Sequence, residues 1–438
     1  MSRSSRFHLP KLSVIDIASF FGALFLILLP WQARIIIFPG MLGVEYSEYG
    51  TFSFFINDII LALFLLSSAM TIGEFRARGP RSVAYGLTLF LLIAILSINN
   101  SSLQSVSFFA VFSLAVRGIA IALACTYATL HKSWLMWGVI VSGLMQSSLA
   151  LVQFFSQQIV ALPGFGMVDH APATIGSAVI QVGSERILRA YGTLGHPNML
   201  GGLLVVSLLC ALWMFVYTKT RNTRLYAGAS LILISAGLCV SLSRQAWIGA
   251  IIASVIFLGY CFFNRVRNSL MLGAALCLLL VPIAFVSTHV DLVYTRLFAS
   301  SALEQNSIEE RKDFLDQTQT IIRDNGWLGI GIGETTHYIY THDRKKIDAY
   351  SYQPIHNVTL LIWQEIGLYG VVAWYALLLA PCILFFKKNL HAPNPFILAL
   401  LALFIISWFD HYLWSLPFGI SLFWMVYGLS LTEASSSG

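Results

Sequence analysis

The sequence predicts an all-α polytopic membrane protein with about twelve transmembrane helices. Of its 438 residues, 57% are hydrophobic and only 11% are charged, which excludes an ordinary soluble globular protein. Apolar runs long enough to cross a hydrocarbon core of roughly 30 Å recur along the whole chain. Because backbone N–H and C=O groups in lipid must be bonded within the protein, we expect helices rather than strands in these runs.

Twelve windows share this apolar character. In chain order they are residues 13–31, 51–73, 82–99, 105–127, 134–155, 199–218, 226–241, 247–263, 270–288, 357–386, 395–409 and 412–431. The first window lacks a small-residue cleavage site and leads into further spans, so we expect a retained helix rather than a signal peptide. The windows show no internal repeat, which weighs against transporters built from duplicated halves. We treat residues 1–438 as one integral membrane domain.

Lysine and arginine gather in alternate connections between the windows. The cationic connections and N-terminus contain Arg3, Arg6, Lys11, Arg76, Arg78, Arg81, Lys132, Lys219, Arg221, Arg224, Arg265, Arg267, Lys387 and Lys388. The positive-inside rule makes this side cytoplasmic, with both termini on it. The outer side then carries 32–50, 156–198, 242–246, 289–356 and 410–411. Since about half of the basic residues are topology signals, the net charge of +6 predicts no nucleic-acid partner.

Two long outer segments interrupt the apolar pattern. The segment 156–198 is rich in Gly, Pro and Ala, and the segment 289–356 contains an expected amphipathic helix over about 307–324. Ser307 and Glu310 form a capping-box signature there. The helix is followed by a glycine-dense turn over 325–333 and by the basic run Arg344, Lys345 and Lys346. We expect residues 432–438 to be a frayed tail or a cloning remnant.

His356 is the candidate for acid–base chemistry. It lies where the long outer segment re-enters an apolar helix, and a histidine is the side chain best suited to accept a proton near neutral pH. The simpler alternative is an interfacial histidine that caps the next helix. The adjacent Asn357 either orients the His356 ring or begins that helix.

Three outer arginines are candidates for binding an anionic group, because a guanidinium binds phosphate in a bidentate manner. Arg244 lies in the short outer connection 242–246, next to the membrane surface, where snorkelling is the alternative explanation. Arg311 lies in the first turn of the expected amphipathic helix, where the helix dipole disfavours a cation. Arg189 precedes a Gly/Pro turn that also contains His196 and Asn198. We expect His196 and Asn198 to shape that turn, with a second polar contact to substrate as the alternative.

Other polar residues favour structural roles. The spacing of His337, His342 and Asp343 does not match a zinc site, and we expect no metal or other cofactor. The Gly329–Gly333 run does not open a βαβ unit, so it does not predict a nucleotide site. The six cysteines lie in or beside apolar windows and read as small hydrophobic side chains.

Three charged residues lie well inside apolar windows, away from their ends: Asp58, Arg117 and Glu365. Charges in a bilayer require partners. We expect either Asp58 or Glu365 to pair with Arg117. A proton or ion pathway is the functional alternative, but three scattered charges do not make a relay.

Four short motifs follow one another along the chain: Arg189…Gly192…Pro197-Asn198, Ser243-Arg244, Arg311…Gly329-Ile-Gly331-Ile-Gly333, and His356-Asn357-Val-Thr-Leu360 followed by Gly367 and Gly370. Their order and spacing resemble the O-antigen ligase/polymerase superfamily. The twelve-window plan and the large penultimate outer loop resemble that family as well. Such a resemblance implies a GT-C-like glycosyltransferase of the bacterial inner membrane with a periplasmic active site. The outer segments 156–198 and 289–356 would then be periplasmic loops, and the second would hold the catalytic residues.

The resemblance also implies a reaction. A glycan on undecaprenyl pyrophosphate would be the donor and lipid A–core the acceptor, with membrane lipids around the protein. Arg244 and Arg311, helped by Arg189, would bind the donor pyrophosphate, and His356 would deprotonate an acceptor sugar hydroxyl. Asn357, His196 and Asn198 would give supporting contacts. The transfer would invert the anomeric centre without a metal.

Three alternatives remain open. The length without an extra soluble domain resembles the ligase branch more than the protein-glycosylating branch, but an O-antigen polymerase that extends the lipid-linked glycan is harder to exclude. A lipid-linked glycan flippase would need a polar central cavity and broken helices near the midplane, whereas the polar residues here gather at one face. A structural membrane subunit would not require the arginine and histidine set.

Overall fold

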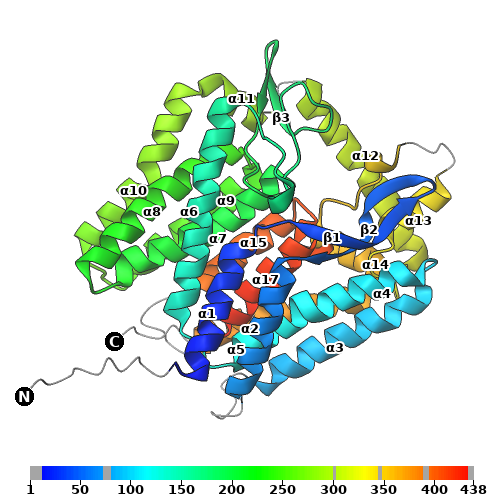
Figure 1. The fold of residues 1–438 in the computed structure, drawn as a ribbon, viewed down its shortest axis with the longest axis horizontal. Helices are drawn as coiled ribbons and strands as arrows, with labels where there is room; N and C mark the ends of the chain where they lie inside the picture. Colours follow the sequence, from blue (N-terminus) through cyan, green and yellow to red (C-terminus); the bar gives the residue numbers. More distant parts are fainter. Residues whose placement is uncertain (1–11, 73–79, 299–301, 344–347, 388–393, 433–438) are drawn as a thin grey trace, which may run out of the picture.

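The computed structural model describes residues 12–72, 80–298, 302–343, 348–387 and 394–432. Figure 1 shows a bundle of helices with two β-hairpins and a group of shorter helices beside it. The bundle helices are α1 (Val14–Leu28), α2 (Asn57–Ile72), α3 (Arg81–Ser97), α4 (Gln104–Ser113), α5 (Ile121–Tyr127), α6 (Lys132–Ser156), α7 (Pro197–Tyr217), α8 (Arg221–Ser241), α9 (Arg244–Phe263), α10 (Asn268–Thr288), α14 (Val358–Lys387), α15 (Pro395–Ser407) and α17 (Pro417–Ser430).

Every apolar window contains helix, which confirms the predicted fold class. Among the described residues, eight helical stretches are long and apolar enough to cross a membrane. The four shorter apolar helices α1, α2, α15 and α17 occupy the remaining windows. The window 105–127 holds both α4 and α5, joined by a π-helical segment, η2 (Leu114–Ala120). The number of twelve spans stays a prediction, because length alone does not show that the shorter helices cross.

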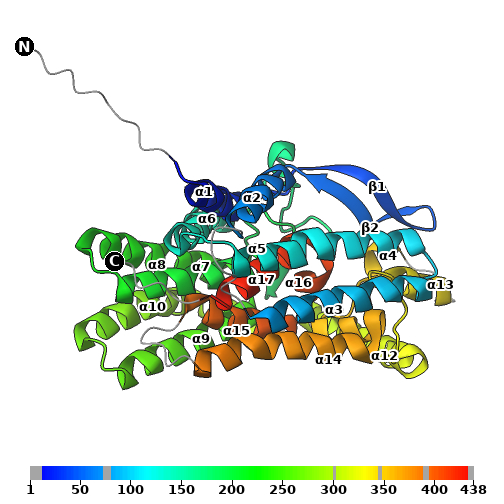
Figure 2. The ribbon, with the colours of Figure 1, turned by 90° about the horizontal axis from the view of Figure 1, so that it is seen from below.

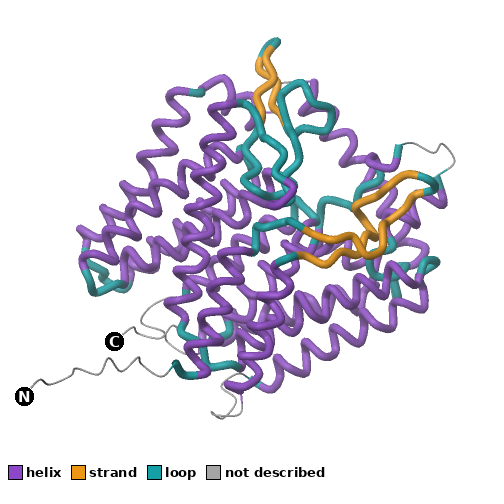
Figure 3. Tube along the Cα trace, in the orientation of Figure 1, coloured by secondary structure: helices purple, strands orange, loops and turns teal. Residues whose placement is uncertain are grey.

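The outer segments contain more regular structure than the sequence analysis predicted, which was the amphipathic helix alone. They form β1 (Arg34–Leu42), β2 (Glu45–Phe55), β3 (Val179–Val182), β4 (Glu185–Leu188), α11 (Val290–Phe298), α12 (Ala302–Asn325) and α13 (Thr335–His342), of which α12 is the predicted helix. The short helix α16 (Tyr412–Ser415) lies at the start of the last apolar window. Strands β1 and β2 pair antiparallel, as do β3 and β4. Figure 3 shows the two hairpins projecting from the helices. The prediction of a helix over 51–73 was wrong for its first residues, because β2 extends to Phe55.

Helix boundaries correct two further expectations. The expected helix 307–324 begins earlier, at Ala302, so the Ser307–Glu310 signature does not mark its start. The side chains of those two residues, the basic run 344–346 and the tail 433–438 lie outside the described residues. Arg221 and Arg224 lie in the first turn of α8 rather than in a loop.

Helix α7 forms the centre of the bundle. Nearly all of its side chains are buried, and it packs against α6, α8, α9 and α15. A helix that is apolar all round is expected to be enclosed by others. Figure 2 shows α1, α2 and the β1–β2 hairpin on one edge of the molecule and α12 and α14 on the opposite edge.

Helix α14 is broken at Gly367, whose backbone is non-helical with φ +75°. The hydroxyls of Thr359 and Tyr375 lie 3.0 Å apart, although sixteen residues of continuous helix would separate their backbones by about 24 Å. The chain therefore bends back sharply at Gly367. The turn after α12 packs into this break, where Ile330 N donates to Gln364 O at 2.8 Å and Leu368 N donates to Gly326 O at 2.9 Å.

We expect Gly367→Ala to destabilise the fold by more than backbone strain alone, which is about 1–3 kcal/mol at such a conformation. An added Cβ would lie 2.3 Å from the Trp327 carbonyl oxygen. Gly176→Ala is the matched control, because Gly176 has φ +83° but no atom within 4 Å of the Cβ position. Thermal unfolding in detergent should show the larger loss for Gly367→Ala. Equal losses would mean that the turn does not support the break.

Two of the three charged residues well inside the apolar windows form an ion pair. Arg117 Nε donates to Asp58 Oδ1 at 2.9 Å, and Arg117 Nη2 donates to the Ser53 carbonyl at 3.0 Å. Of the two partners predicted for Arg117, Asp58 is therefore the one observed. Glu365 instead accepts hydrogen bonds from Thr335 Oγ1 at 2.9 Å and Trp414 Nε1 at 2.8 Å. These contacts give each of the three residues a structural role.

Candidate active site

Asp410 is the point at which distant segments of the chain meet. It lies between α15 and α16 and is 5% exposed. Its Oδ2 accepts hydrogen bonds from Asn198 Nδ2 at 2.7 Å and from Gln245 Nε2 at 2.9 Å. Its Oδ1 accepts from the backbone N–H of His411 at 2.8 Å. Side chains from three of the five predicted outer connections thus share one carboxylate.

The other two predicted outer connections reach the same place. The His356 ring, from 289–356, lies edge-on to the His411 ring with centroids 5.1 Å apart. The Tyr49 hydroxyl, from 32–50, lies 3.4 Å from His411 Nε2. All five segments therefore lie on one side of the bundle, as the charge pattern predicted. We call Asp410, His411, His356, His196 and Asn198 the outer cluster.

Burial governs the charge state of the outer cluster. Burial by itself would raise the pKa of the Asp410 carboxyl, but His411, His356, His196 and the Asn198 hydrogen bond outweigh it and hold that pKa below its usual range. Burial lowers the pKa of both His196 and His411 to about 3. The cluster therefore holds one carboxylate among neutral imidazoles at neutral pH.

His356 has a buried ring nitrogen that is not used in a hydrogen bond within the described part of the protein. Its Nδ1 is buried and has no hydrogen-bond partner among the described residues. Its ring also stacks on Phe314 of α12, with centroids 6.1 Å apart. Burial lowers the pKa of His356, Asp410 opposes that shift, and Arg311 adds to it. The imidazole is therefore neutral at pH 7 and able to accept a proton.

His411 and His196 have partners instead. His411 Nδ1 lies 2.7 Å from Ser415 Oγ. His196 is the N-cap of α7, where its Nδ1 accepts from the Asn198 backbone N–H at 3.1 Å. The expectation that His196 shapes a turn agrees with this geometry.

The three predicted arginines lie around the outer cluster at different depths. Arg189 is 5% exposed, and its Nη2 donates to Asn198 Oδ1 at 2.8 Å while its Nε donates to the Ser241 carbonyl at 3.1 Å. Arg244 is the first residue of α9, next to Gln245, and is partly exposed. Arg311, on α12, acts electrostatically on His356. The structure thus brings all three to the side that holds His356.

Arg296 is a fourth cation at this place. It lies on α11, is 8% exposed, and its Nε donates to the Leu242 carbonyl at 2.8 Å. Arg244 Nη1 in turn donates to the Arg296 carbonyl at 3.2 Å. These bonds tie α11 to the connection between α8 and α9 and fix the position of the Arg244 guanidinium.

Asn357 proves to be a helix-start residue. Its Oδ1 accepts from the Leu360 backbone N–H at 3.0 Å, and its Nδ2 donates to the Trp408 carbonyl at 3.3 Å. Of the two roles predicted for Asn357, the structure shows the cap at the start of α14. Its contact with Trp408 also fixes the His356 loop against the end of α15.

Sequence reasoning missed Asp410, His411 and Gln245. The signal was present, because Asp410 and His411 form the entire expected connection 410–411 between two apolar windows. The argument that singled out Arg244 in a short outer connection applies equally to them. Gln245 gave no signal of its own, since a neutral amide beside an apolar helix is common.

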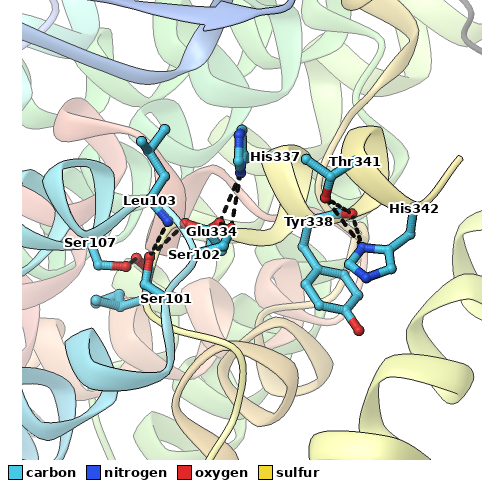
Figure 4. A network of polar contacts seen from close by, with 10 residues as sticks. Ser101, Ser102, Leu103, Ser107, Glu334, His337, Tyr338, Thr341 and His342 are labelled. Carbon is cyan, nitrogen blue, oxygen red and sulfur yellow. Dashed lines mark hydrogen bonds and ion pairs between the residues drawn. The ribbon is translucent and has the colours of Figure 1, made fainter.

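The residues near His337 form a separate network, shown in Figure 4. Glu334 is fully buried, accepts from Ser101 Oγ at 2.7 Å, and lies 2.9 Å from His337 Nδ1. His342 stacks on Tyr338, while Asp343 accepts from the Tyr352 hydroxyl at 2.7 Å. The three residues considered for a metal therefore have different partners. Within the described ranges, no three His, Cys, Asp or Glu side chains are grouped to hold a metal.

An apolar cavity of about 510 Å³ lies between α9, α14 and α15. Its lining includes Ile256, Tyr260, Tyr375, Leu378, Leu401 and Phe404. Tyr375 is bonded to Thr359, three residues after His356, so one end of the cavity lies close to the outer cluster. Leu379 and Ile256 are well exposed, so the cavity opens toward the lipid-facing surface.

The O-antigen ligase family model (Wzy_C) matches residues 229–375. The matched stretch runs from α8 into α14 and contains Arg244, Arg311 and His356. The outer cluster extends beyond it on both sides, to His196 and to Asp410. No curated protein matches the chain.

Proposed function

Because this chain is a member of the O-antigen ligase/polymerase superfamily, we propose that it is an O-antigen ligase. It transfers a glycan from undecaprenyl pyrophosphate to a sugar hydroxyl of lipid A–core. The observation that carries the proposal is the partly buried, neutral imidazole of His356, which packs against His411 next to Asp410 and lies in the electrostatic field of Arg311. A proton acceptor next to cations suits the attack of a hydroxyl on a substrate with an anionic leaving group.

His356 is the general base of the proposed reaction. It removes the proton of the acceptor hydroxyl while the oxygen attacks the anomeric carbon from the face opposite the pyrophosphate. The bond from that carbon to the pyrophosphate breaks, and its electron pair leaves with the phosphate. A single displacement of this kind inverts the anomeric centre. The depressed pKa of His356 keeps the base unprotonated as the pH falls somewhat below 7.

The arginines stabilise the charge that develops on the leaving pyrophosphate. Arg244 and Arg311 are partly exposed, so we propose that they contact the phosphates. Arg189 is deeper, and we propose that it contributes its charge from behind Asn198. Electrostatic stabilisation by pre-positioned donors is commonly the largest contribution to such catalysis. With arginines in this role, the proposed transfer requires no metal.

The lipid part of the donor lies in the apolar cavity. A polyprenyl chain attached to a pyrophosphate at the outer cluster would reach Tyr375 at once and continue between α9, α14 and α15. The cavity supports a lipid-linked donor rather than a soluble sugar nucleotide. We also propose a GT-C-like enzyme in the bacterial inner membrane with cytoplasmic termini and a periplasmic active site, because the Lys/Arg bias marks the opposite side as cytoplasmic.

Arg244→Ala is expected to reduce transfer by about 10²–10³-fold, the usual effect of removing one donor to a developing charge. Arg244→Lys should fail as well, because a point charge does not replace the bidentate guanidinium. Arg323→Ala is the matched control, since Arg323 is a well-exposed arginine on α12 that bonds Asp324. Initial rates in detergent or proteoliposomes measure the effect. Near-full activity of Arg244→Ala would show that this arginine does not hold the leaving group.

The function is tested with purified protein, undecaprenyl-pyrophosphate-linked glycan and lipid A–core, with and without EDTA. A ligase shifts the lipopolysaccharide band on a gel, and EDTA leaves that shift unchanged. Lengthening of the lipid-linked glycan without a shift would identify a polymerase. Movement of unmodified donor across a vesicle membrane, without acceptor and without release of undecaprenyl pyrophosphate, would identify a flippase. Either of the last two results would overturn the proposal.

A further inference from the structure

We propose that Asp410 is a positioning residue whose carboxylate stabilises the cationic form of His356 that arises during transfer. This inference rests on the proposed function, in which His356 accepts the proton of the acceptor hydroxyl. Asp410 touches neither substrate in this proposal. It acts through the charge that it places beside the His356–His411 pair.

The geometry fixes the carboxylate firmly. Asn198 and Gln245 donate to one oxygen, and the His411 backbone N–H donates to the other. Asn198 is itself held by Arg189 at 2.8 Å and by Ser243 Oγ at 3.2 Å. A carboxylate fixed by so many donors keeps its position when a proton arrives on a neighbouring ring.

Protonation of His356 needs such a counter-charge. The ring is largely buried, so its cation loses hydration. The charged and titratable groups that face it are Arg311 from α12, His411 and Asp410 from the connection before α16, and His196 from the start of α7. Arg311 opposes the cation. Of the described groups acting on His356, Asp410 is the one that favours it.

The neighbouring histidines, His196 and His411, do not neutralise the charge of Asp410. Burial holds the pKa of His196 and of His411 at about 3, so neither ring carries a charge near neutral pH. A charged His411 would neutralise Asp410 locally and remove its effect on His356. The carboxylate itself is 5% exposed, so water screens its charge little.

The proton balance of the step is simple. The acceptor hydroxyl loses its proton to His356, its oxygen bonds to the anomeric carbon, and the leaving pyrophosphate takes the electron pair of the broken bond. His356 is then an imidazolium that Asp410 stabilises and Arg311 destabilises, and it later releases the proton to water. Asp410 stays ionised throughout, because its pKa lies below the usual carboxyl range.

The test measures the protonation of His356 directly, without substrate. Diethyl pyrocarbonate acylates neutral imidazole, so the pH dependence of its addition at residue 356, mapped by peptide mass spectrometry, reports the pKa of His356. Asp410→Asn should move the midpoint to lower pH by about one unit or more. Asp324→Asn, which removes an exposed carboxylate of α12, is the matched control and should not move it.

Transfer rates give a second readout. The acidic limb of the pH–rate profile of Asp410→Asn should also move to lower pH, and its plateau should fall about 10- to 100-fold, because a weaker base is a poorer proton acceptor. Gln245→Met removes a hydrogen bond to Asp410 but keeps the charge, so its pH profile should stay unchanged. If Asp410→Asn does not fold, Asp410→Ser, also neutral, is measured in its place.

The outcomes separate the two proposals. If the pH midpoint of acylation at His356 is the same in Asp410→Asn or Asp410→Ser as in the wild type, the proposed role of Asp410 is wrong, whatever the transfer rate. If Asp410→Asn loses only as much transfer activity as Gln245→Met and its pH–rate profile does not shift, Asp410 has a merely structural role. That result would also overturn the proposal. A lower acylation midpoint in Asp410→Asn supports the role of Asp410, even if the wild type transfers no glycan to lipid A–core. Absence of that transfer would refute only the ligase proposal.

Discussion

His356→Ala is expected to lower the rate of glycan transfer by about 10²–10⁴-fold, the usual contribution of a positioned general base. The ring occupies a largely buried position against His411 and Phe314, and alanine cannot accept the proton. His342→Ala is the matched control, because His342 is an exposed histidine of α13 that stacks on Tyr338. Single-turnover transfer with both purified variants measures the effect.

The variant must fold for this result to have meaning. Its elution as a single species in detergent and an unfolding temperature close to that of the wild type establish that point. Transfer by His356→Ala at more than a tenth of the wild-type rate would remove the base from the mechanism. The three arginines would then remain as the sole supported part of the site.

The second large effect concerns stability. Arg117→Leu is expected to cost about 3–5 kcal/mol, because it leaves the largely buried Asp58 carboxylate without its cation. Arg34→Leu is a matched control, since Arg34 also pairs with a glutamate and its guanidinium also lies over the Phe55 ring, at 5.8 Å against 5.3 Å for Arg117. The Arg34–Glu48 pair is more exposed, so its loss should cost about 1 kcal/mol or less.

A double variant separates charge from packing. Asp58→Asn with Arg117→Gln removes both charges and keeps an acceptor for the Phe55 N–H, which donates to Asp58 at 2.8 Å. It should recover most of the stability lost in Arg117→Leu. Chemical or thermal unfolding in detergent measures all four proteins. An equal loss for the double variant would show that the Arg117 side chain stabilises the bundle by packing rather than by neutralising Asp58.

The sequence predicted the helices well because the bilayer imposes a simple rule. Each apolar window must satisfy its own backbone, and only a helix does so within one segment. The hairpins were missed because they lie outside that constraint. Their turns did carry a signal: Gly43-Val44 and Gly183-Ser184 each join two strands directly, and glycine at the first position of a two-residue turn is typical of a hairpin.

The break in α14 could not be predicted from the apolar composition of its window. A window of thirty apolar residues is compatible with one tilted helix, and composition does not distinguish it from two segments meeting at Gly367. The decisive information is tertiary, because the turn after α12 supplies the backbone partners that let the helix stop. Gly367 and Gly370 were noticed as part of a motif, but the bend itself follows only from the Thr359–Tyr375 contact.

The candidate site was partly predictable. His356 and the three arginines stood out because each is a strongly polar residue at the edge of an apolar window. Their common location followed from the charge bias, which placed five connections on one side. The role of Asn198 as a bridge between Arg189 and Asp410 did not follow, because a turn sequence alone does not reveal which distant carboxylate its amide will meet.

The position of Asp410 has a consequence for biosynthesis. A membrane protein is inserted from its N-terminus as the ribosome advances, so Asn198 and Gln245 are synthesised long before the connection after α15. Until Asp410 arrives, their amide groups have no carboxylate to bind. The loops around His356 are therefore completed late, after most of the helices are in place. A nascent chain that stalls earlier would hold its arginines and its histidine but lack the centre that organises them.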